Sequence, residues 1–307
     1  MTDRRQWPRV IAHVRGDAPG PMLIVLGGIH GNEPAGLLAA RALLDGDAPP
    51  IERGDLVVLA GNRAALALGV RYQARDLNRD WSDRALAALP ESGGTPEDHE
   101  QRELWTAIDG LLNRARGPAY FLDLHTTSAA GHPFVVVGDD PAHRAFAHAF
   151  GLPVFLGLVG TLHGALTPYL CAKHAATAIA IEGGQHDDPA AVARHGAVLR
   201  VALVECGLLP ASSLGAADAP DGPRALLERA RMDLPHEIRI VSRYAITPED
   251  GFRMEPGFAN IHPVRAGMLL ARDRHGEIRA PEDGLVVMPL YQGLGDEGFF
   301  LGQAVGS

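Results

Sequence analysis

Two side chains that can bind one metal ion, His30 and Glu33, stand three positions apart. They follow the apolar residues 22–26, where a strand would end and a helix would begin. If this turn is helical, residues i and i+3 project from one face. His125 follows the apolar residues 119–122 and offers a third ligand at another strand end. Two imidazoles and one carboxylate are a catalytic zinc set with a position left for water, so we predict one Zn²⁺ per chain.

The neighbours of these ligands strengthen the prediction. A lone histidine is more often a surface or hydrogen-bonded residue than a ligand, but Gly27, Gly28 and Gly31 allow a tight turn around His30. Asp123 stands two residues before His125. It either orients that imidazole from behind or is a simple turn carboxylate.

Glu182 follows the small and β-branched residues 177–181, which predict a buried strand. A carboxylate at such a strand end either caps the next helix or takes part in catalysis. Beside activated water it would accept a proton during attack and pass it to the leaving nitrogen.

Residues 71–81 carry Arg71, Arg75 and Arg79 at four-residue intervals, with Asn78 between them. One interpretation is a solvated helix face paired with nearby aspartates. The other is an anion clamp, in which Asn78 and Arg79 hold a carboxylate and Arg71 or Arg75 points at the scissile carbonyl oxygen.

The order of apolar and amphipathic segments predicts an α/β fold. Short apolar runs alternate with helical patterns through the first two-thirds of the chain, which favours a mostly parallel or mixed sheet flanked by helices. Such sheets bind ligands beyond the carboxyl ends of their strands. The expected strands are residues 22–26, 56–60, 120–124, 133–137 and 177–181, and the expected helices are residues 35–44, 97–114, 141–150 and 189–206.

The composition and the spacing of apolar segments change after residue 209. Residues 210–223 are rich in Ala, Ser, Gly, Pro and Asp, which is typical of a linker. From residue 234 onward the apolar segments are short and separated by turns. We therefore predict an α/β domain at 1–209, a linker or long loop at 210–233 and a small β-rich domain at 234–307.

Composition excludes several classes of protein. The net charge is −9 and basic residues form no run, which argues against nucleic-acid binding. No stretch approaches the roughly 18 apolar residues of a membrane span, and residues 1–8 lack the apolar core of a signal peptide. We expect a cytoplasmic protein whose two cysteines, Cys171 and Cys206, are packing residues.

Four motifs occur together and in order. They are Gly-Gly-Ile-His-Gly-Asn-Glu at 27–33, Arg-Tyr at 71–72 before Asp-Leu-Asn-Arg at 76–79, Asp-Leu-His-Thr-Thr-Ser at 123–128, and Ile-Glu-Gly-Gly at 181–184. Together they resemble the succinylglutamate desuccinylase and aspartoacylase family, relatives of the zinc carboxypeptidases. The resemblance covers about residues 20–210.

The resemblance implies a carboxypeptidase-like α/β domain followed by a small β domain. It implies zinc on His30, Glu33 and His125, with Glu182 as general base and acid. It further implies that Arg71 polarises the scissile carbonyl and that a substrate carboxylate is bound by Asn78 and Arg79. Thr126 to Ser128 would shape the pocket floor. Enzymes of this family hydrolyse the amide of an N-acyl amino acid.

The resemblance has one gap. Aspartoacylases carry a further arginine about ten residues before the catalytic glutamate, whereas residues 167–174 here contain none. This argues against N-acetylaspartate and leaves Tyr169, Lys173 or His163 to recognise the substrate side chain. Residues 280–289 resemble the turn of a lipoyl or biotinyl carrier but lack its lysine, so we expect a structural β module.

The predicted function is therefore a zinc-dependent amidohydrolase acting on a small anionic N-acyl amino acid or related amide. Two alternatives remain open: a metallocarboxypeptidase acting on peptides, and a non-catalytic sensor of acyl amino acids. A serine hydrolase is disfavoured because the sequence has no Gly-x-Ser-x-Gly elbow. Neither the acyl group nor the assembly state is fixed by a motif, and a homo-oligomer is allowed.

Overall fold

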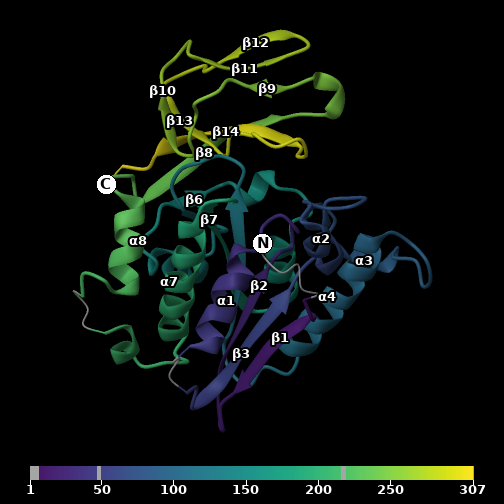
Figure 1. The fold of residues 1–307 in the computed structure, drawn as a ribbon, viewed down its shortest axis with the longest axis vertical. Coiled ribbons are helices and arrows are strands. Elements are labelled where there is room, and N and C mark those ends of the chain that lie inside the picture. Colours follow the sequence, from purple (N-terminus) through teal and green to yellow (C-terminus); the bar gives the residue numbers. More distant parts are fainter. Residues whose placement is uncertain (1–6, 47–49, 216–218, 307) are drawn as a thin grey trace.

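The computed structural model describes residues 7–46, 50–215 and 219–306 and is organised around one large mixed sheet (Figure 1). Within these residues the sheet has 11 strands. In spatial order they are β1 (Val10–Arg15), β3 (Arg53–Ala60), β2 (Ala18–Gly27), β4 (Ala119–Thr127), β7 (Ala176–Gln185), β5 (Phe134–Val136), β6 (Val154–Leu156), β8 (Glu237–Ala245), β14 (Glu297–Ala304), β13 (Gly284–Val287) and β10 (His262–Val264).

The strands that carry the predicted ligands are parallel neighbours at the centre of this sheet. β2 pairs in parallel with β3 on one side and with β4 on the other, and β4 pairs in parallel with β7. The outer strand β1 is antiparallel to β3, and β5 is antiparallel to β7. The predicted α/β class with a mixed sheet is confirmed.

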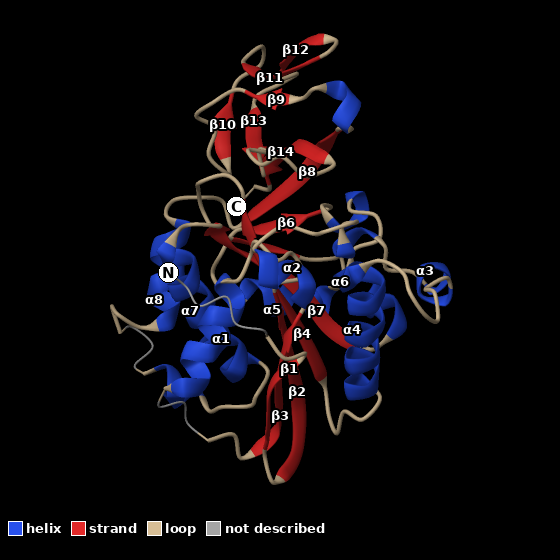
Figure 2. Cartoon of the chain, turned by 45° about the vertical axis from the view of Figure 1, so that its right-hand side comes forward, coloured by secondary structure: helices blue, strands red, loops and turns tan. Residues whose placement is uncertain are grey.

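Helices cover both faces of the sheet (Figure 2). On one face lie α1 (Ala35–Asp45), α5 (Pro141–His148), α7 (Pro189–Glu205) and α8 (Pro223–Arg231); on the other lie α4 (Pro96–Leu112) and α6 (Leu166–Lys173). Each expected helix of the first two-thirds is present within a few residues of its predicted ends. None of the described helices combines the length and the apolar character that a bilayer-spanning segment needs.

The helices on both faces of the sheet explain why the buried residues of β2 form an unbroken apolar run. Leu23 and Val25 pack into the core under α1 and α7, whereas Ile24 and Leu26 pack into the core under α4. All four side chains are at most 1% exposed. Successive residues of a strand point to opposite faces, so a strand with helices on both sides must be apolar at every position.

Short helices and caps position the loops near the site. They are α2 (Arg63–Leu68), α3 (Asp83–Ala87) and the single-turn helices η1 (Leu77–Arg79), η2 (Val159–Thr161), η3 (Ala211–Leu214) and η4 (Pro248–Asp250). The long helix α4 begins with a capping box in which Thr95 and Asp98 satisfy each other's backbone N–H groups. A proline at its first position ends the preceding loop without the loss of a hydrogen bond.

The β-rich region predicted after residue 234 is present. β8, β14, β13 and β10 extend the large sheet, and a second sheet of β12 (Gly276–Arg279), β11 (Leu269–Asp273) and β9 (Arg253–Met254) lies beyond them (Figure 1). Because β8 pairs with both β6 and β14, the two parts of the chain share one sheet. The exact boundaries at 209 and 234 stay a prediction.

The predicted linker at 210–233 contains more structure than its composition indicates. η3 and α8 lie within it, α8 packs on α7, and Leu227 is fully buried. Residues 216–218 of this segment lie outside the described residues, as do residues 1–6 of the N-terminal stretch.

Gly31 provides a test of how tightly the loop after β2 is packed. A Cβ at this residue would lie 2.1 Å from the carbonyl carbon of Ala65 and 2.4 Å from the backbone nitrogen of Leu66. We expect Gly31→Ala to lower the free energy of unfolding by about 1–3 kcal/mol, because backbone must move to admit the methyl group. Denaturant unfolding monitored by circular dichroism measures this change.

The matched control is Gly196→Ala in the middle of α7, where an added Cβ would meet nothing within 4 Å. This change should stabilise the protein by up to about 1 kcal/mol, because alanine loses less backbone entropy in a helix. Equal unfolding curves for both variants would contradict the close approach at Gly31.

Candidate active site

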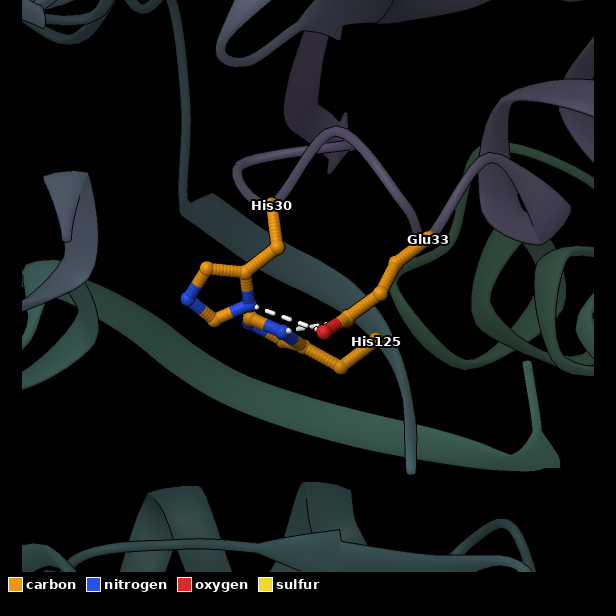
Figure 3. A group of neighbouring side chains, drawn as sticks. All are labelled: His30, Glu33 and His125. Carbon is orange, nitrogen blue, oxygen red and sulfur yellow. Dashed lines mark hydrogen bonds and ion pairs between the residues drawn. The ribbon is translucent and has the colours of Figure 1, made fainter. Parts of the chain in front are cut away.

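His30, Glu33 and His125 meet in the structure (Figure 3). Nδ1 of His30 lies 3.0 Å from Oε1 of Glu33, and Nδ1 of His125 lies 3.1 Å from Oε2 of the same carboxylate. One donor atom from each residue lies within 4.8 Å of the other two, and all three residues are buried. The three side chains therefore converge on a single point from two different elements.

The ligands reach this point through the turn after β2 and through β4. The backbone N–H of Glu33 donates to the carbonyl of His30 at 3.1 Å, which closes a tight turn, and α1 begins at Ala35. The helical turn that the sequence left open for His30 and Glu33 is thus not formed. Gly28, with φ of +69°, provides a left-handed residue directly after β2, before this turn begins.

Each imidazole is held from behind by a second carboxylate. Nε2 of His30 lies 3.1 Å from Oδ1 of Asp76, and Nε2 of His125 lies 3.1 Å from Oδ2 of Asp123. Such a partner fixes the ring orientation and leaves Nδ1 free to bind a metal. Asp123, fully buried on β4, is therefore no turn carboxylate.

The charges around the ligands keep the glutamate ionised. Burial alone would raise the pKa of Glu33, but the neighbouring His30 and His125 hold it well below its usual range. Burial would lower the pKa of His125, but Asp123 and Glu33 raise it well above its usual range. The backbone N–H of Thr126 donates to Oε2 of Glu33 at 3.0 Å and further fixes this carboxylate.

This donor set fits zinc. Zinc bonds of about 2.0–2.2 Å in tetrahedral geometry place neighbouring ligand atoms about 3.3–3.5 Å apart, close to the separations between Glu33 and the two imidazoles. Two nitrogen donors, one carboxylate and two outer carboxylates are the environment that catalytic zinc sites use.

Glu182 lies beside the ligands on the adjacent strand. Its Cα pairs with that of His125 in the register of β4 and β7. The side chain is 7% exposed, and its Oε2 has no hydrogen-bond partner among the described residues. Burial raises the pKa of Glu182 to about 7. Asp188 caps α7, so Glu182 is not a helix cap.

Arg71 lies at the metal ligands. Its Nη1 is 3.4 Å from Oε1 of Glu33, and its Nη2 donates to Oδ2 of Asp76 at 2.9 Å. The surrounding residues 71–81 form a loop with the single turn η1, so the interpretation as a helix face is wrong. Buried Glu97 explains the loop, because its carboxylate accepts the backbone N–H groups of Gln73 and Ala74.

Asn78 and Arg79 line the same cavity but already have partners. Oδ1 of Asn78 accepts the backbone N–H of Leu166 at 2.9 Å, which leaves its amide N–H groups for other acceptors. Nη2 of Arg79 donates to Oε2 of Glu297 at 2.9 Å, and its Nε lies 3.4 Å from Asp296. The arginine of the predicted anion clamp is therefore already paired with carboxylates of the C-terminal region.

Arg75 and Tyr169 do not reach the cavity. Arg75 pairs with Asp80 and Asp98, and the hydroxyl of Tyr169 donates to Asp83 at 2.7 Å. Their predicted substrate contacts do not agree with this placement, because local carboxylates hold both side chains outside. Lys173 pairs with Asp83 as well, and His163 lines a neighbouring surface hollow together with Tyr169 and Lys173.

The cavity extends from the ligands towards the β-rich region and has a volume of about 990 Å³ including its mouth. Thr126 and Ser128 line it, as the resemblance implies. Residues of the segment 288–297 also line it. This segment is held there by the backbone N–H of Tyr291, which donates to Oγ of Ser128 at 3.1 Å, and by the Arg79–Glu297 pair. The C-terminal region is thus part of the site.

Three residues contribute to the site in ways that the motifs did not predict. Asp76 belongs to the quoted Asp-Leu-Asn-Arg motif, whose spacing does not show that this aspartate would face His30. Glu297 lies in a segment without any motif, so only the fold reveals it. His195, fully buried on α7, donates from Nε2 to the carbonyl of His125 at 3.0 Å; burial lowers its pKa to about 4, which keeps the ring neutral.

Comparison with known proteins identifies the family. A model of the succinylglutamate desuccinylase/aspartoacylase catalytic domain matches residues 19–195. That range is more than half of the 307 residues, so the chain belongs to this family. The resemblance inferred from the four motifs is confirmed.

Individual relatives are more distant. An N-acyl-aromatic-L-amino acid amidohydrolase (carboxylate-forming) from Xenopus tropicalis is 32% identical over 121 residues, an alignment that covers 38% of each protein. The match therefore spans well under half of that relative's length. A succinylglutamate desuccinylase from Burkholderia thailandensis is 28% identical over 269 residues, covering 82% of this chain and 70% of the relative.

Solved structures share the fold. A product-bound ectoine utilization protein from Ruegeria pomeroyi superposes with a TM-score of 0.68 at 21% identity, covering 94% of this chain and 87% of the other. A succinylglutamate desuccinylase/aspartoacylase from Rhodobacter sphaeroides gives a TM-score of 0.68 at 19% identity, covering 95% and 88%. Both matches extend over the α/β part and the β-rich region.

The buried carboxylate of Glu182 should reduce stability. Its folded-state pKa of about 7 lies above the ordinary value of 4.5, so folding favours the protonated form. The contribution of Glu182 to the stability of the metal-free protein should therefore fall as pH rises from 4.5 through 7, and comparison with a variant at this residue isolates that contribution. Glu182→Gln cannot ionise, and at pH 8 its free energy of unfolding should exceed that of the wild type by up to about 3 kcal/mol.

Chemical denaturation of chelated protein across pH 4 to 8 measures this difference. The control is Glu228→Gln, which changes an exposed carboxylate on α8 and should leave the pH dependence unaltered. If the free energy of unfolding of the wild type at pH 8 equals or exceeds that of Glu182→Gln, burial of the ionised carboxylate does not reduce stability and the prediction is wrong.

Proposed function

We propose that this protein is a zinc-dependent hydrolase that cleaves the amide bond of a small N-acyl amino acid. One observation carries the proposal. A buried carboxylate without a hydrogen-bond partner, Glu182, lies on the strand next to a metal-ligand set, and both line one cavity. The relatives named as an N-acyl amino acid amidohydrolase and a desuccinylase support an amide substrate.

Each residue then has a distinct task. When bound, zinc supplies Lewis acidity, which lowers the pKa of water towards about 7 and polarises the substrate oxygen. Glu182 accepts the proton of the attacking water and passes it to the leaving nitrogen. Its pKa of about 7 suits both transfers, because the carboxylate is a useful base and its acid form a useful donor near neutral pH.

Arg71 is placed to stabilise negative charge that develops on the scissile carbonyl oxygen. Its guanidinium is held at the ligands by Asp76 and is 10% exposed, so it needs little reorganisation when charge appears. The substrate carboxylate is proposed to bind the amide N–H of Asn78 and the guanidinium of Arg79. The substrate carboxylate can bind Arg79 only if Glu297 or Asp296 shares this guanidinium or moves away from it.

The alternatives fit the site less well. A sensor gains nothing from an unpaired buried carboxylate that costs stability. A carboxypeptidase must admit a polypeptide, whereas residues of the segment 288–297 line this cavity and narrow it. Hydrolysis of N-acyl amino acids and of dipeptides by zinc-loaded and chelated protein tests the proposal. Turnover of the acyl amino acids that is lost with chelation and restored by zinc is expected.

Glu182→Gln should remove most of this turnover while zinc remains bound. The amide side chain keeps the shape of the carboxylate but cannot accept the proton, and this transfer contributes about 10²- to 10⁴-fold. Initial-rate kinetics together with zinc analysis of the same sample give both quantities. Glu228→Gln is the control and should retain wild-type kcat. A Glu182→Gln enzyme with undiminished kcat would remove this residue from the mechanism.

The pH dependence follows from the same carboxylate. Glu182 acts as a base only when ionised, so kcat/KM should fall about tenfold per pH unit below its pKa. Without metal this pKa is about 7, and a bound cation lowers it further, so the acidic limb should lie at or below pH 7. Rates that increase between pH 7 and pH 5 would contradict the assignment.

A further inference from the structure

The cations of the cavity are already matched by carboxylates. Among the described residues that line it, the guanidinium groups belong to Arg71 and Arg79. Arg71 pairs with Glu33 and Asp76, and Arg79 lies between Glu297 and Asp296. One substrate carboxylate can share Arg79, but no further guanidinium remains for a second.

His186 offers no substitute cation site. It lines the cavity, but its Nδ1 lies 2.8 Å from the hydroxyl of Thr126 and its Nε2 lies 3.3 Å from Oε1 of Gln292. Both ring nitrogens therefore have partners within the wall. Glu297 also lines the cavity, but its two oxygens are paired with Arg79 and with Arg243, so this pair leaves no free cation for a second carboxylate.

One end of the cavity is apolar, whereas Thr127, Ser128, Thr167 and Gln292 give its remaining lining uncharged polar groups. Ala180 lies two residues before Glu182 on β7 and so faces the same side of the sheet. Val136 pairs with Ala180 on the next strand, β5. Around them lie side chains from a loop, from η2 and from the β-rich region: Leu158, Val159, Leu162, Met288 and Phe300. All belong to the core cluster at the junction of the two parts of the chain.

We propose that the substrate carries a single carboxylate and presents uncharged, apolar acyl and side-chain groups to this end of the cavity. The proposal rests on the proposed function and specifies its substrate class. A second carboxylate, on the acyl group or on the side chain, would be buried against Val136 and Ala180 without a partner. Each added methylene that is buried there should instead raise kcat/KM about fourfold.

Four substrates test this with the zinc-loaded full chain. N-acetylleucine and N-hexanoylleucine carry one carboxylate, N-succinylleucine has a second on the acyl group, and N-acetylaspartate has a second on the side chain. We expect kcat/KM to be highest for N-hexanoylleucine. For each of the two dicarboxylates we expect a kcat/KM at least tenfold lower than that of N-acetylleucine. A dicarboxylate that is cleaved as fast as N-acetylleucine overturns this inference but supports the proposed function. Failure to cleave any of the four overturns both.

Leu162 provides the charge test. It is half-buried in the loop after η2, where it lines the cavity. Leu162→Arg adds the missing cation and should raise kcat/KM for a dicarboxylate relative to N-acetylleucine by at least tenfold. Leu162→Gln introduces a polar, uncharged side chain of a length similar to that of leucine and should leave this ratio unchanged. Equal ratios for the two variants overturn the charge argument.

Equilibrium binding separates recognition from chemistry. Calorimetry of zinc-loaded Glu182→Gln with intact N-acetylleucine and N-acetylaspartate should give a Kd at least tenfold lower for N-acetylleucine. Tighter binding of N-acetylaspartate overturns the inference whatever the rates show.

Discussion

The structure depends on one constraint: the buried carboxylate of Glu33 is held between two imidazoles. Glu33 is 2% exposed, and its two oxygens face His30 and His125. This arrangement requires β2 and β4 to be adjacent and parallel, so that a turn after one strand meets a side chain near the end of the other. The parallel register of these strands pairs Gly27 with Leu124, and this brings His30, Glu33 and His125 together.

The same constraint explains why the site should hold a divalent cation. Glu33, Asp76, Asp123 and Glu182 place four carboxylates around two imidazoles, with one guanidinium, that of Arg71, among them. Buried charges are stable only when they are paired or bind metal. A divalent cation bound between these residues would supply the missing positive charge and make the cluster favourable. Glu182 keeps an unpaired oxygen even so, and that local cost is typical of a group retained for chemistry.

Much of the metal site could be predicted from the sequence, because its signals are local. Apolar runs mark the strands, and His30, Glu33, His125 and Glu182 stand directly after or near the ends of these runs. The inference needs only the rule that parallel strands gather their carboxyl ends at one edge. The sequence left open whether the turn holding His30 is helical; in the structure α1 begins only at Ala35, and Gly31 lies against the backbone of α2.

The remaining parts of the site depend on contacts between distant residues. The spacing of three arginines gives no sign that Glu97 pins their loop, or that Arg71 turns inward while Arg75 turns outward. Glu297 lies 218 residues from Arg79 and is brought to it only because β14 continues the sheet beyond β8. Predicted substrate contacts depend on such distant pairs, and this is why the motifs indicate the candidate metal site better than the substrate.

The most direct test is a crystal structure of the zinc-loaded protein with anomalous diffraction recorded on both sides of the zinc absorption edge. The account predicts one strong zinc peak per chain, bonded to Nδ1 of His30, Nδ1 of His125 and the carboxylate of Glu33, with Glu182 facing the open side. A zinc-loaded crystal without that peak, or with zinc bound at other residues, would contradict it.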